Sequence, residues 1–221
     1  MIANRSEALR AVLETLGRYG LLLLSDASLP SLVSIVVGEP LRTSWWAHPL
    51  GGLIYRVSSL LEDHPDVLTT KLIAGKVTYV HRPLWPAVFA IGTAREGWQT
   101  DQLSAAARSL LQQVDTDSEV QTNDIALPAG PRRRDIPKAA RELERQLLVH
   151  ATEIHTPTGA HAKVLETWQH WADRMIFHPG GVAVADARRQ LEDAAARLAD
   201  GAAVNVRLPW QKIGDSIPCD A

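Results

Sequence analysis

The residues best suited to chemistry form a basic cluster over residues 132–145, which holds six basic and three acidic side chains. This local charge of +3 contrasts with the net charge of −2 of the 221-residue chain. Lys138, Arg141 and Arg145 are three and four residues apart, so in a helix they share one face. Such a face can neutralise phosphates and enter the major groove of duplex DNA. The alternative is an ordinary solvated helix face, because two glutamates are interleaved with the cations.

A predicted hairpin follows this helix and adds a second polar surface. Residues 147–155 are expected to be extended, the Thr-Pro-Thr-Gly sequence after them favours a turn, and residues 162–168 form the return strand. His155 and His161 flank the turn and are expected to face each other. With His150 they match no standard zinc spacing, so we predict neither a metal nor a cofactor. A plain polar hairpin surface is the alternative to a DNA-binding wing. The predicted DNA-binding residues are Arg132, Arg133, Arg134, Lys138, Arg141, Arg145, His155, Thr158, His161 and Lys163.

The densest aromatic stretch lies in the first half, where Trp45, Trp46 and His48 occur within four residues. These side chains could line a pocket, stack on an extruded base, or anchor a loop on the core. Anchoring is the favoured interpretation, since large aromatic side chains mostly serve packing. The chain has no phosphate-binding loop, no Gly-x-Ser-x-Gly elbow and no cysteine nucleophile with an evident histidine partner.

The elements that must position the basic cluster have a recognisable order. Ser104 can cap a helix with apolar residues at helical spacing, and a polar stretch over residues 115–124 follows it. Pro137 opens the basic helix, whose apolar side includes Leu143, and the hairpin comes next. Helix, short segment, helix and hairpin together are the layout of a winged helix-turn-helix. A last amphipathic helix is predicted from Val184 to Leu198.

The first half is predicted to be a separate unit of helices and a hairpin. Ser6 can cap its first helix, and a second helix is expected to end at residues 63–65. The short apolar runs at 21–24 and 32–37 fit either strands or buried connectors. Residues 67–82 are predicted to form a β-hairpin, and a further helix begins at Arg82. The predicted fold class is α+β, with an N-terminal domain at 1–98, a winged helix-turn-helix domain at 99–178 and a C-terminal helix and tail at 179–221.

Composition limits the classes of protein that remain. Apolar residues make up 46% and charged residues 22%, which excludes intrinsic disorder as a description of the whole chain. The single cysteine, Cys219, excludes an intramolecular disulfide and a cysteine-based zinc site. No signal peptide and no stretch of about 18 apolar residues is recognised. We therefore predict a soluble cytoplasmic protein without a membrane partner.

Four stretches carry a resemblance to a known family. They are Leu29–Leu32, Lys71–Thr78, Leu103-Ser104 with Arg108–Leu111, and Ala140–Val149, which leads into the hairpin. These stretches, in this order, resemble small bacterial proteins related to the AlkZ type of DNA glycosylase, which is built from winged-helix modules. The resemblance extends over most of the chain. It implies a DNA-binding winged helix with a place in DNA repair, and by itself it does not imply catalysis.

Glycosylases of the AlkZ type use a Gln-x-Gln or Gln-x-Asp pair to position water and to stabilise the developing sugar cation. The sequence contains Gln99-Thr100-Asp101 and Gln113-Val114-Asp115. The family's pair follows the opening segment of the protein, whereas these pairs fall near the ends of helices, so neither is expected to be catalytic. If the protein is an enzyme, its candidate catalytic residues are Asp115, Gln113 and Glu39.

The sequence thus predicts a protein that binds duplex DNA through a basic recognition helix and a wing, with a link to DNA repair. Two alternatives stay open. One is a DNA glycosylase that receives a flipped base at Trp45, Trp46 and His48. The other is a protein-interaction module that uses the apolar surface of the winged helix, and a homodimer belongs to this alternative.

Overall fold

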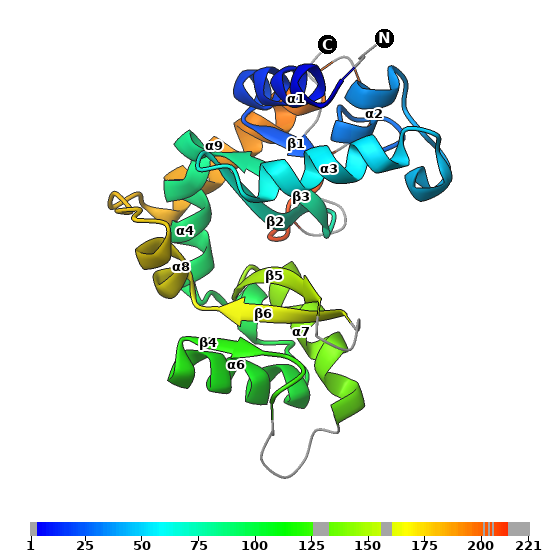
Figure 1. Ribbon diagram of the computed structural model, residues 1–221. Helices are drawn as coiled ribbons and strands as arrows, with labels where there is room; N and C mark the ends of the chain where they lie inside the picture. The colour runs from blue at the N-terminus through cyan, green and yellow to red at the C-terminus, as the bar shows by residue number, and fades with distance from the viewer. Residues whose placement is uncertain are drawn as a thin grey trace. The chain divides into compact units, whose positions relative to one another are not determined.

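A computed structural model describes residues 4–125, 133–155, 161–200, 202, 204 and 206–211. The chain forms two compact units (Figure 1). Unit 1 comprises Met1–Ala87 with Arg188–Ala221, and unit 2 comprises Val88–Ala187. The C-terminal segment, which the sequence analysis sets apart as 179–221, therefore divides at Arg188, and most of it belongs to unit 1. The divisions fall within helices α4 (Trp85–Ala94) and α9 (Val184–Leu198).

Unit 1 contains a three-stranded antiparallel sheet in the order β1-β3-β2. Leu22 of β1 and Thr69 of β2 both pair with Tyr79, which places β3 at the centre of the sheet. The elements up to α4 are α1 (Arg5–Tyr19), β1 (Leu21–Leu23), α2 (Leu32–Val37), η1 (Trp45–Ala47), α3 (Gly51–Glu62), β2 (Val67–Ile73), β3 (Lys76–His81) and η2 (Arg82–Leu84). The predicted second helix and hairpin are both confirmed.

Local chemistry explains where the helices of unit 1 begin. Asn4, rather than the predicted Ser6, caps α1 by accepting a hydrogen bond from the backbone N–H of Glu7 at 3.0 Å. Residues 32–37 form a helix and not a strand, because Ser31 and Ser34 make a reciprocal capping box at its start. Both α1 and α2 end at a glycine with positive φ, where a residue with a Cβ would be strained.

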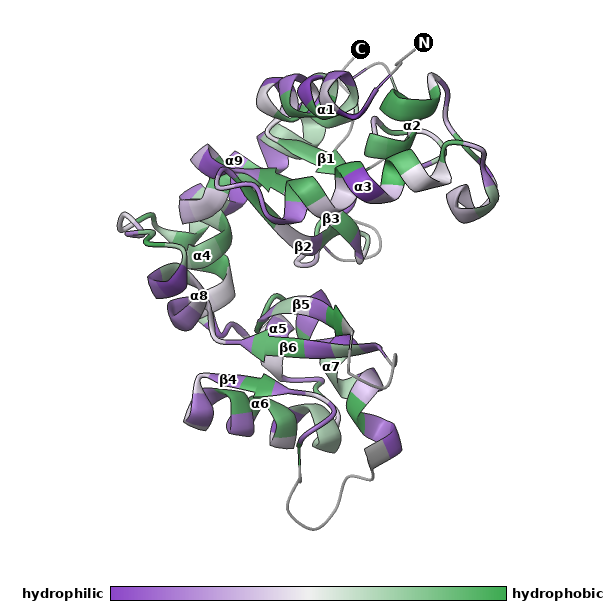
Figure 2. Ribbon diagram, viewed as in Figure 1, coloured by the Kyte–Doolittle hydropathy of each residue, from purple (hydrophilic) through white to green (hydrophobic). Residues whose placement is uncertain are grey.

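The core of unit 1 lies between these helices and the sheet. Figure 2 shows β1 as hydrophobic throughout, whereas α1 carries both hydrophobic and hydrophilic residues. The Tyr79 hydroxyl is buried and lies 3.0 Å from the Ser58 hydroxyl. The buried cluster consists of Ala8, Val12, Leu16, Leu22, Leu32, Val33, Val36, Ile54, Val57, Leu61, Val67 and Tyr79.

Unit 2 is built on a second antiparallel sheet, in the order β4-β6-β5, with β6 between its two neighbours (Figure 1). His150 of β5 and Glu119 of β4 both pair with Glu166 at the end of β6. The elements after α4 are α5 (Gly97–Thr100), α6 (Ala105–Asp117), β4 (Glu119–Gln121), η3 (Arg133–Asp135), α7 (Ile136–Arg145), β5 (His150–His155), β6 (His161–Glu166) and α8 (Trp168–Arg174). The described elements confirm the α+β class.

The predicted helices of unit 2 are confirmed with their caps and buried faces. The Ser104 hydroxyl caps α6 by accepting from the Ala107 N–H at 3.2 Å, as the sequence predicts. In α7, Ile136, Ala140 and Leu143 are buried as expected. They join a core cluster that also contains Leu103, Ala107, Leu110, Leu111, Val114, Val120, Ala139, Leu148, Val149 and Leu165.

The two units share one order of elements. In each, a long helix precedes a short edge strand, a later helix packs on that first helix, and a hairpin follows whose second strand is central in the sheet. Unit 1 has an additional α-helix, α2, between the edge strand and the helix before the hairpin, for which the described residues of unit 2 have no counterpart. Helix α3 in unit 1 and helix α7 in unit 2 hold corresponding places, immediately before the hairpin. Over the described ranges, no helix has the length and hydrophobicity needed to cross a membrane.

Candidate nucleic-acid interface

Predicted cations lie on the exposed face of α7 and, for Arg134, on the η3 turn directly before it. Arg134, Lys138, Arg141 and Arg145 are all exposed. The Arg141 Nε donates to the Pro137 carbonyl oxygen at 3.0 Å, which holds that side chain along the helix. Within the described part of the chain, none of these four cations forms an ion pair with a carboxylate. Their charges are therefore available to an anionic ligand.

The two glutamates of α7 do not compensate these cations, although they are interleaved with them in the sequence. The Glu142 carboxylate accepts from the Ser104 backbone N–H at 2.7 Å and from the Ser104 hydroxyl at 2.8 Å. It thus lies at the N-terminus of α6, where the helix dipole favours a negative charge. Glu144 is buried and accepts from the Lys163 ammonium. Both acidic side chains have structural partners away from the cationic face.

Lys163, a predicted DNA contact, has carboxylate partners within the protein. Its side chain is only 17% exposed, and its ammonium contacts Glu144 and lies 3.9 Å from a carboxylate oxygen of Glu153. If this lysine moved away, the buried Glu144 carboxylate would lose its compensating charge. Lys163 therefore contributes to the stability of the hairpin, and its contact with DNA stays a prediction.

The hairpin itself has the predicted register. His155 pairs with His161 across it, and the His161 side chain is exposed. Thr158 and Arg132, with the side chains of Arg133 and His155, lie outside the described residues. The described part of the interface is thus the face of α7 with the base of the hairpin.

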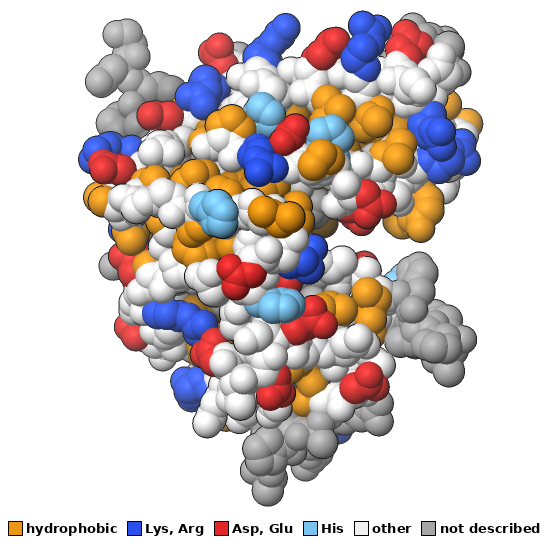
Figure 3. Space-filling view, turned by 60° about the vertical axis from the view of Figure 1, so that its left-hand side comes forward, with side chains coloured by type: hydrophobic (Ala, Val, Ile, Leu, Met, Phe, Trp, Pro, Cys, Tyr) orange, Lys and Arg blue, Asp and Glu red, His pale blue; other side chains and the backbone are white. Residues whose placement is uncertain are grey.

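The surface seen in Figure 3 provides a contrast with α7. There, acidic, basic and hydrophobic side chains are interspersed, in keeping with the net charge of −2. No charge of one sign dominates that face.

The candidate catalytic residues Asp115 and Gln113 already have partners within unit 2. Asp115 is exposed on α6 and accepts from the Arg95 guanidinium at 2.7 Å, while Gln113 donates to the carboxylate of Asp117. Glu39 is exposed and belongs to unit 1. In the other Gln-x-Asp pair, Gln99 is buried and donates to the Gln146 carbonyl oxygen at 3.0 Å. In both pairs the glutamine side chain is thus hydrogen-bonded to another residue of the protein.

The sequence analysis missed a buried ionic cluster centred on Glu166. This side chain is 3% exposed and accepts four hydrogen bonds. His150 Nδ1 and His170 Nδ1 donate at 2.8 and 2.9 Å, and the Arg174 guanidinium donates at 2.5 and 3.2 Å. Burial alone would raise the pKa of Glu166, but the hydrogen bonds and charges of His150 and Arg174 outweigh it and hold the pKa at about 2. The only sequence signal is the four-residue spacing of Glu166, His170 and Arg174.

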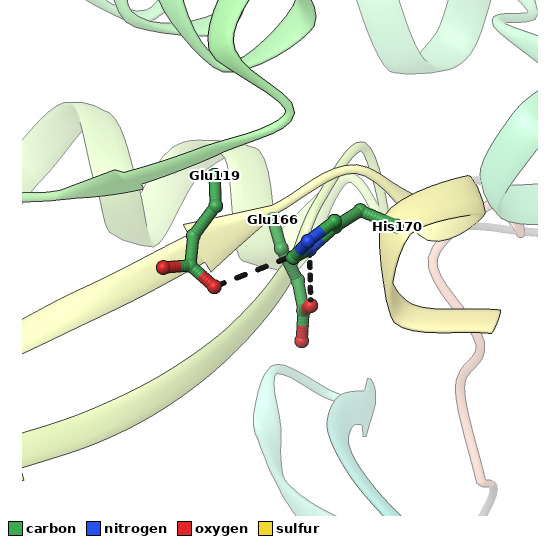
Figure 4. A group of neighbouring side chains, drawn as sticks. All are labelled: Glu119, Glu166 and His170. Atoms are coloured by element: carbon green, nitrogen blue, oxygen red, sulfur yellow. Dashed lines mark hydrogen bonds and ion pairs between the residues drawn. The ribbon is translucent and has the colours of Figure 1, made fainter. Parts of the chain in front are cut away.

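Part of this cluster has the residue types of a metal site. Oxygen or nitrogen atoms of Glu119, Glu166 and His170 lie within 4.8 Å of one another (Figure 4). However, each oxygen of Glu166 already accepts two N–H donors, which fills the lone pairs of a carboxylate. The Arg174 guanidinium also supplies the positive charge that a cation would supply. The donor set does not fit a metal, and the cluster fits a structural ion-pair network that joins β5, β6 and α8.

The aromatic stretch of unit 1 divides into two parts. Trp45 packs against the core of unit 1, and His48 Nδ1 accepts from the Leu50 N–H at 3.1 Å to shape the turn. Trp46 stacks on Trp45, with ring centroids 4.1 Å apart, but 66% of its own surface is exposed. The expected anchoring on the core therefore describes Trp45, while Trp46 points outward.

Comparison with protein-family models, with curated proteins and with solved structures found no match for this chain, so the assignment of function depends on the geometry described above.

Proposed function

We propose that unit 2 binds duplex DNA through the exposed face of α7, with Arg134, Lys138, Arg141 and Arg145 contacting phosphates. One observation carries the proposal. These four cations have no carboxylate partner among the described residues, while both glutamates of the same helix are engaged by Ser104 and Lys163. A row of uncompensated, exposed cations on a rigid helix matches the phosphate backbone.

The order of elements supports this assignment. A helix, an edge strand, a second helix and a hairpin, with the second strand of the hairpin central, are the order of a winged helix-turn-helix. In that arrangement α7 is the recognition helix, and its N-terminal part contacts the major groove. Arg134 and Lys138 lie at this N-terminal part. The buried Ile136, Ala140 and Leu143 fix the orientation of the helix against the core.

Fluorescence anisotropy with a random duplex tests the proposal. Four phosphate contacts give a log–log salt slope of about −3 to −4, so affinity should fall roughly 100-fold between 50 and 200 mM salt. The double variant Lys138→Ala with Arg141→Ala should bind more weakly and with a slope smaller in magnitude by about 2. Arg108→Ala is the matched control, because Arg108 is an exposed cation on α6.

Two results would contradict the proposal. One is the absence of binding at 50 mM salt. The other is an equal loss in the Arg108 control, which would indicate a diffuse charge effect. In either case the protein-interaction alternative would be preferred.

A link to DNA repair would require preference for a lesion. The same assay with duplexes that carry an alkylated base tests this part separately. The proposal covers binding alone, because the observation that carries it is the set of exposed cations on α7 and η3.

A further inference from the structure

Unit 1 repeats the element order of unit 2, but the helix in the corresponding place carries different chemistry. Helix α3 presents Tyr55 and Arg56 to solvent, and η1 places Trp46 immediately before it. Where α7 presents a row of cations, α3 and η1 present aromatic rings. We call Trp46 and Tyr55, with Trp45 beneath, the aromatic platform.

The platform is rigid. Trp46 stacks on Trp45 with an interplanar angle of 23°, and Trp45 rests on the core. Gly51 permits this arrangement, because a Cβ there would lie only 2.9 Å from the Trp45 carbonyl oxygen and 3.0 Å from that of Trp46. The turn of η1 is therefore fixed against the start of α3. A ring held in this way loses little entropy when a ligand stacks on it.

The outer surface of the platform is exposed. Trp46 is 66% and Tyr55 49% exposed, and their ring centroids are 5.9 Å apart with an interplanar angle of 39°. Apart from Val204, they are the only large hydrophobic side chains exposed in the described part of unit 1. Two rings supply far less than the about 800 Å² that each partner of a stable protein interface buries. The platform is thus suited to one planar group.

The charge beside the platform is positive. Arg42 precedes η1 and Arg56 follows Tyr55 on α3, and both are exposed. Neither forms an ion pair within the part of unit 1 that the structure describes. Between Gly38 and Leu61 the sequence has one acidic residue, Glu39. A planar group attached to an anionic backbone meets both features at once.

We infer that the aromatic platform stacks on an unpaired base of a nucleic-acid strand, with Arg42 and Arg56 contacting its phosphates. Bases inside a duplex already stack on one another, so an unpaired base is required. Base–aromatic stacking tolerates any sequence and is combined with cationic backbone contacts in single-strand binding proteins. The inference rests on the proposed function only in that both concern the same ligand class, and the two sites lie on different units.

The test compares a blunt duplex, the same duplex with a single-stranded overhang, and the single strand alone, each in anisotropy and tryptophan-fluorescence titrations. Trp46→Ala should weaken binding of the single strand and of the overhang by about 10-fold or more, because stacking contributes about 1–3 kcal/mol per base. Trp46→Phe should retain much of the affinity, whereas Trp46→Leu should resemble Trp46→Ala. Ile176→Ala removes another highly exposed apolar side chain, from unit 2, and should have no effect.

Three outcomes would overturn the inference. They are wild-type affinity of Trp46→Ala for the overhang, wild-type affinity of Trp46→Leu, and a dimer of the wild-type protein that Trp46→Ala converts to a monomer. The last would assign the platform to a second copy of the chain. Failure of the α7 proposal looks different: blunt-duplex binding would be absent or insensitive to Lys138 and Arg141, while the overhang would still depend on Trp46.

Discussion

The two units of this protein have a similar order of elements, but they bury different polar groups against the central strands of their sheets. Within the central strand β3 of its sheet, unit 1 has Tyr79, which forms a buried neutral pair with Ser58 of α3. At the end of the central strand β6, unit 2 buries an ionised carboxylate, Glu166, among two histidines and an arginine. A buried charge needs partners that a buried hydroxyl does not, so unit 2 depends on polar contacts from three elements.

The outer faces differ in the same way. Together, η1 and α3 present the rings of Trp46 and Tyr55, whereas α7 presents cations, although α3 and α7 each precede the hairpin of their own unit. A similar backbone arrangement thus carries different exposed side chains, and this difference is why we infer two kinds of nucleic-acid contact from one kind of scaffold.

The largest expected effect is on the stability of unit 2. Glu166→Gln removes the charge that four N–H donors share, and we expect it to lower the free energy of unfolding by roughly 2–4 kcal/mol. Urea unfolding followed by circular dichroism measures this loss. Glu119→Gln is the control, because Glu119 is at the exposed edge of the same cluster and should cost less than about 1 kcal/mol. Equal losses in the two variants would contradict the central role of Glu166.

The α7 double variant should have the next largest effect. Removing two phosphate contacts with Lys138→Ala and Arg141→Ala should weaken duplex binding roughly 10-fold or more near physiological salt. Stability should change little, because both side chains are exposed. Fluorescence anisotropy measures the affinity for the duplex, and circular dichroism verifies that the variant and the wild-type protein are equally folded. A loss of binding that appears only together with a loss of structure would refute the contact role.

The two units should respond to opposite extremes of pH. Glu166 has a folded pKa of about 2, below its ordinary value near 4.3. Its contribution to stability is therefore complete above pH 4–5 and is lost as the pH falls toward 2. Urea midpoints of the wild-type protein should drop over this range more steeply than those of Glu166→Gln. Parallel pH curves would show that Glu166 is not stabilised by its partners.

At alkaline pH the sensitive group lies in unit 1. Burial raises the pKa of Tyr79, so the folded state keeps this hydroxyl neutral while the unfolded chain ionises above pH 10. Stability is therefore lost as the pH rises past 10. In Tyr79→Phe this loss should be smaller, and at neutral pH the variant should cost only about 1 kcal/mol. Urea unfolding at pH 7 measures the stability lost with the Tyr79 hydroxyl, and urea unfolding above pH 10 measures the effect of its ionisation.

The smallest expected effect is on catalysis, where we predict none. A base-release assay on duplexes with alkylated bases should show no product, since Asp115 is in an exposed ion pair with Arg95 and Gln113 is hydrogen-bonded to Asp117. Release of the base would revive the glycosylase alternative. Asp115→Asn and Glu39→Gln, compared at equal DNA affinity, would then identify the residue responsible.

Much of the fold could be predicted because its causes are local. The helix at Ser104, the basic helix from Ile136, the last helix from Val184 and the hairpin at residues 67–82 each depend on spacing, caps or turn residues within a few positions. The exception is α2. Its short apolar run also fits a strand, but the serine capping box at its start stabilises a helix.

The roles of individual side chains could be predicted only in part. The sequence alone determined that Lys138, Arg141 and Arg145 share a helix face opposite Leu143, because helical spacing requires it. The tertiary structure decided that Lys163 compensates Glu144, that Glu166 meets His150 across the sheet, and that Trp46 is exposed while Trp45 is partly buried against the core. The contact of Glu166 with His150 depends on which strands pair and in which register, and the other two facts depend on how a helix or turn packs against the rest of its unit. A register joins residues far apart in the chain, and no local pattern specifies it.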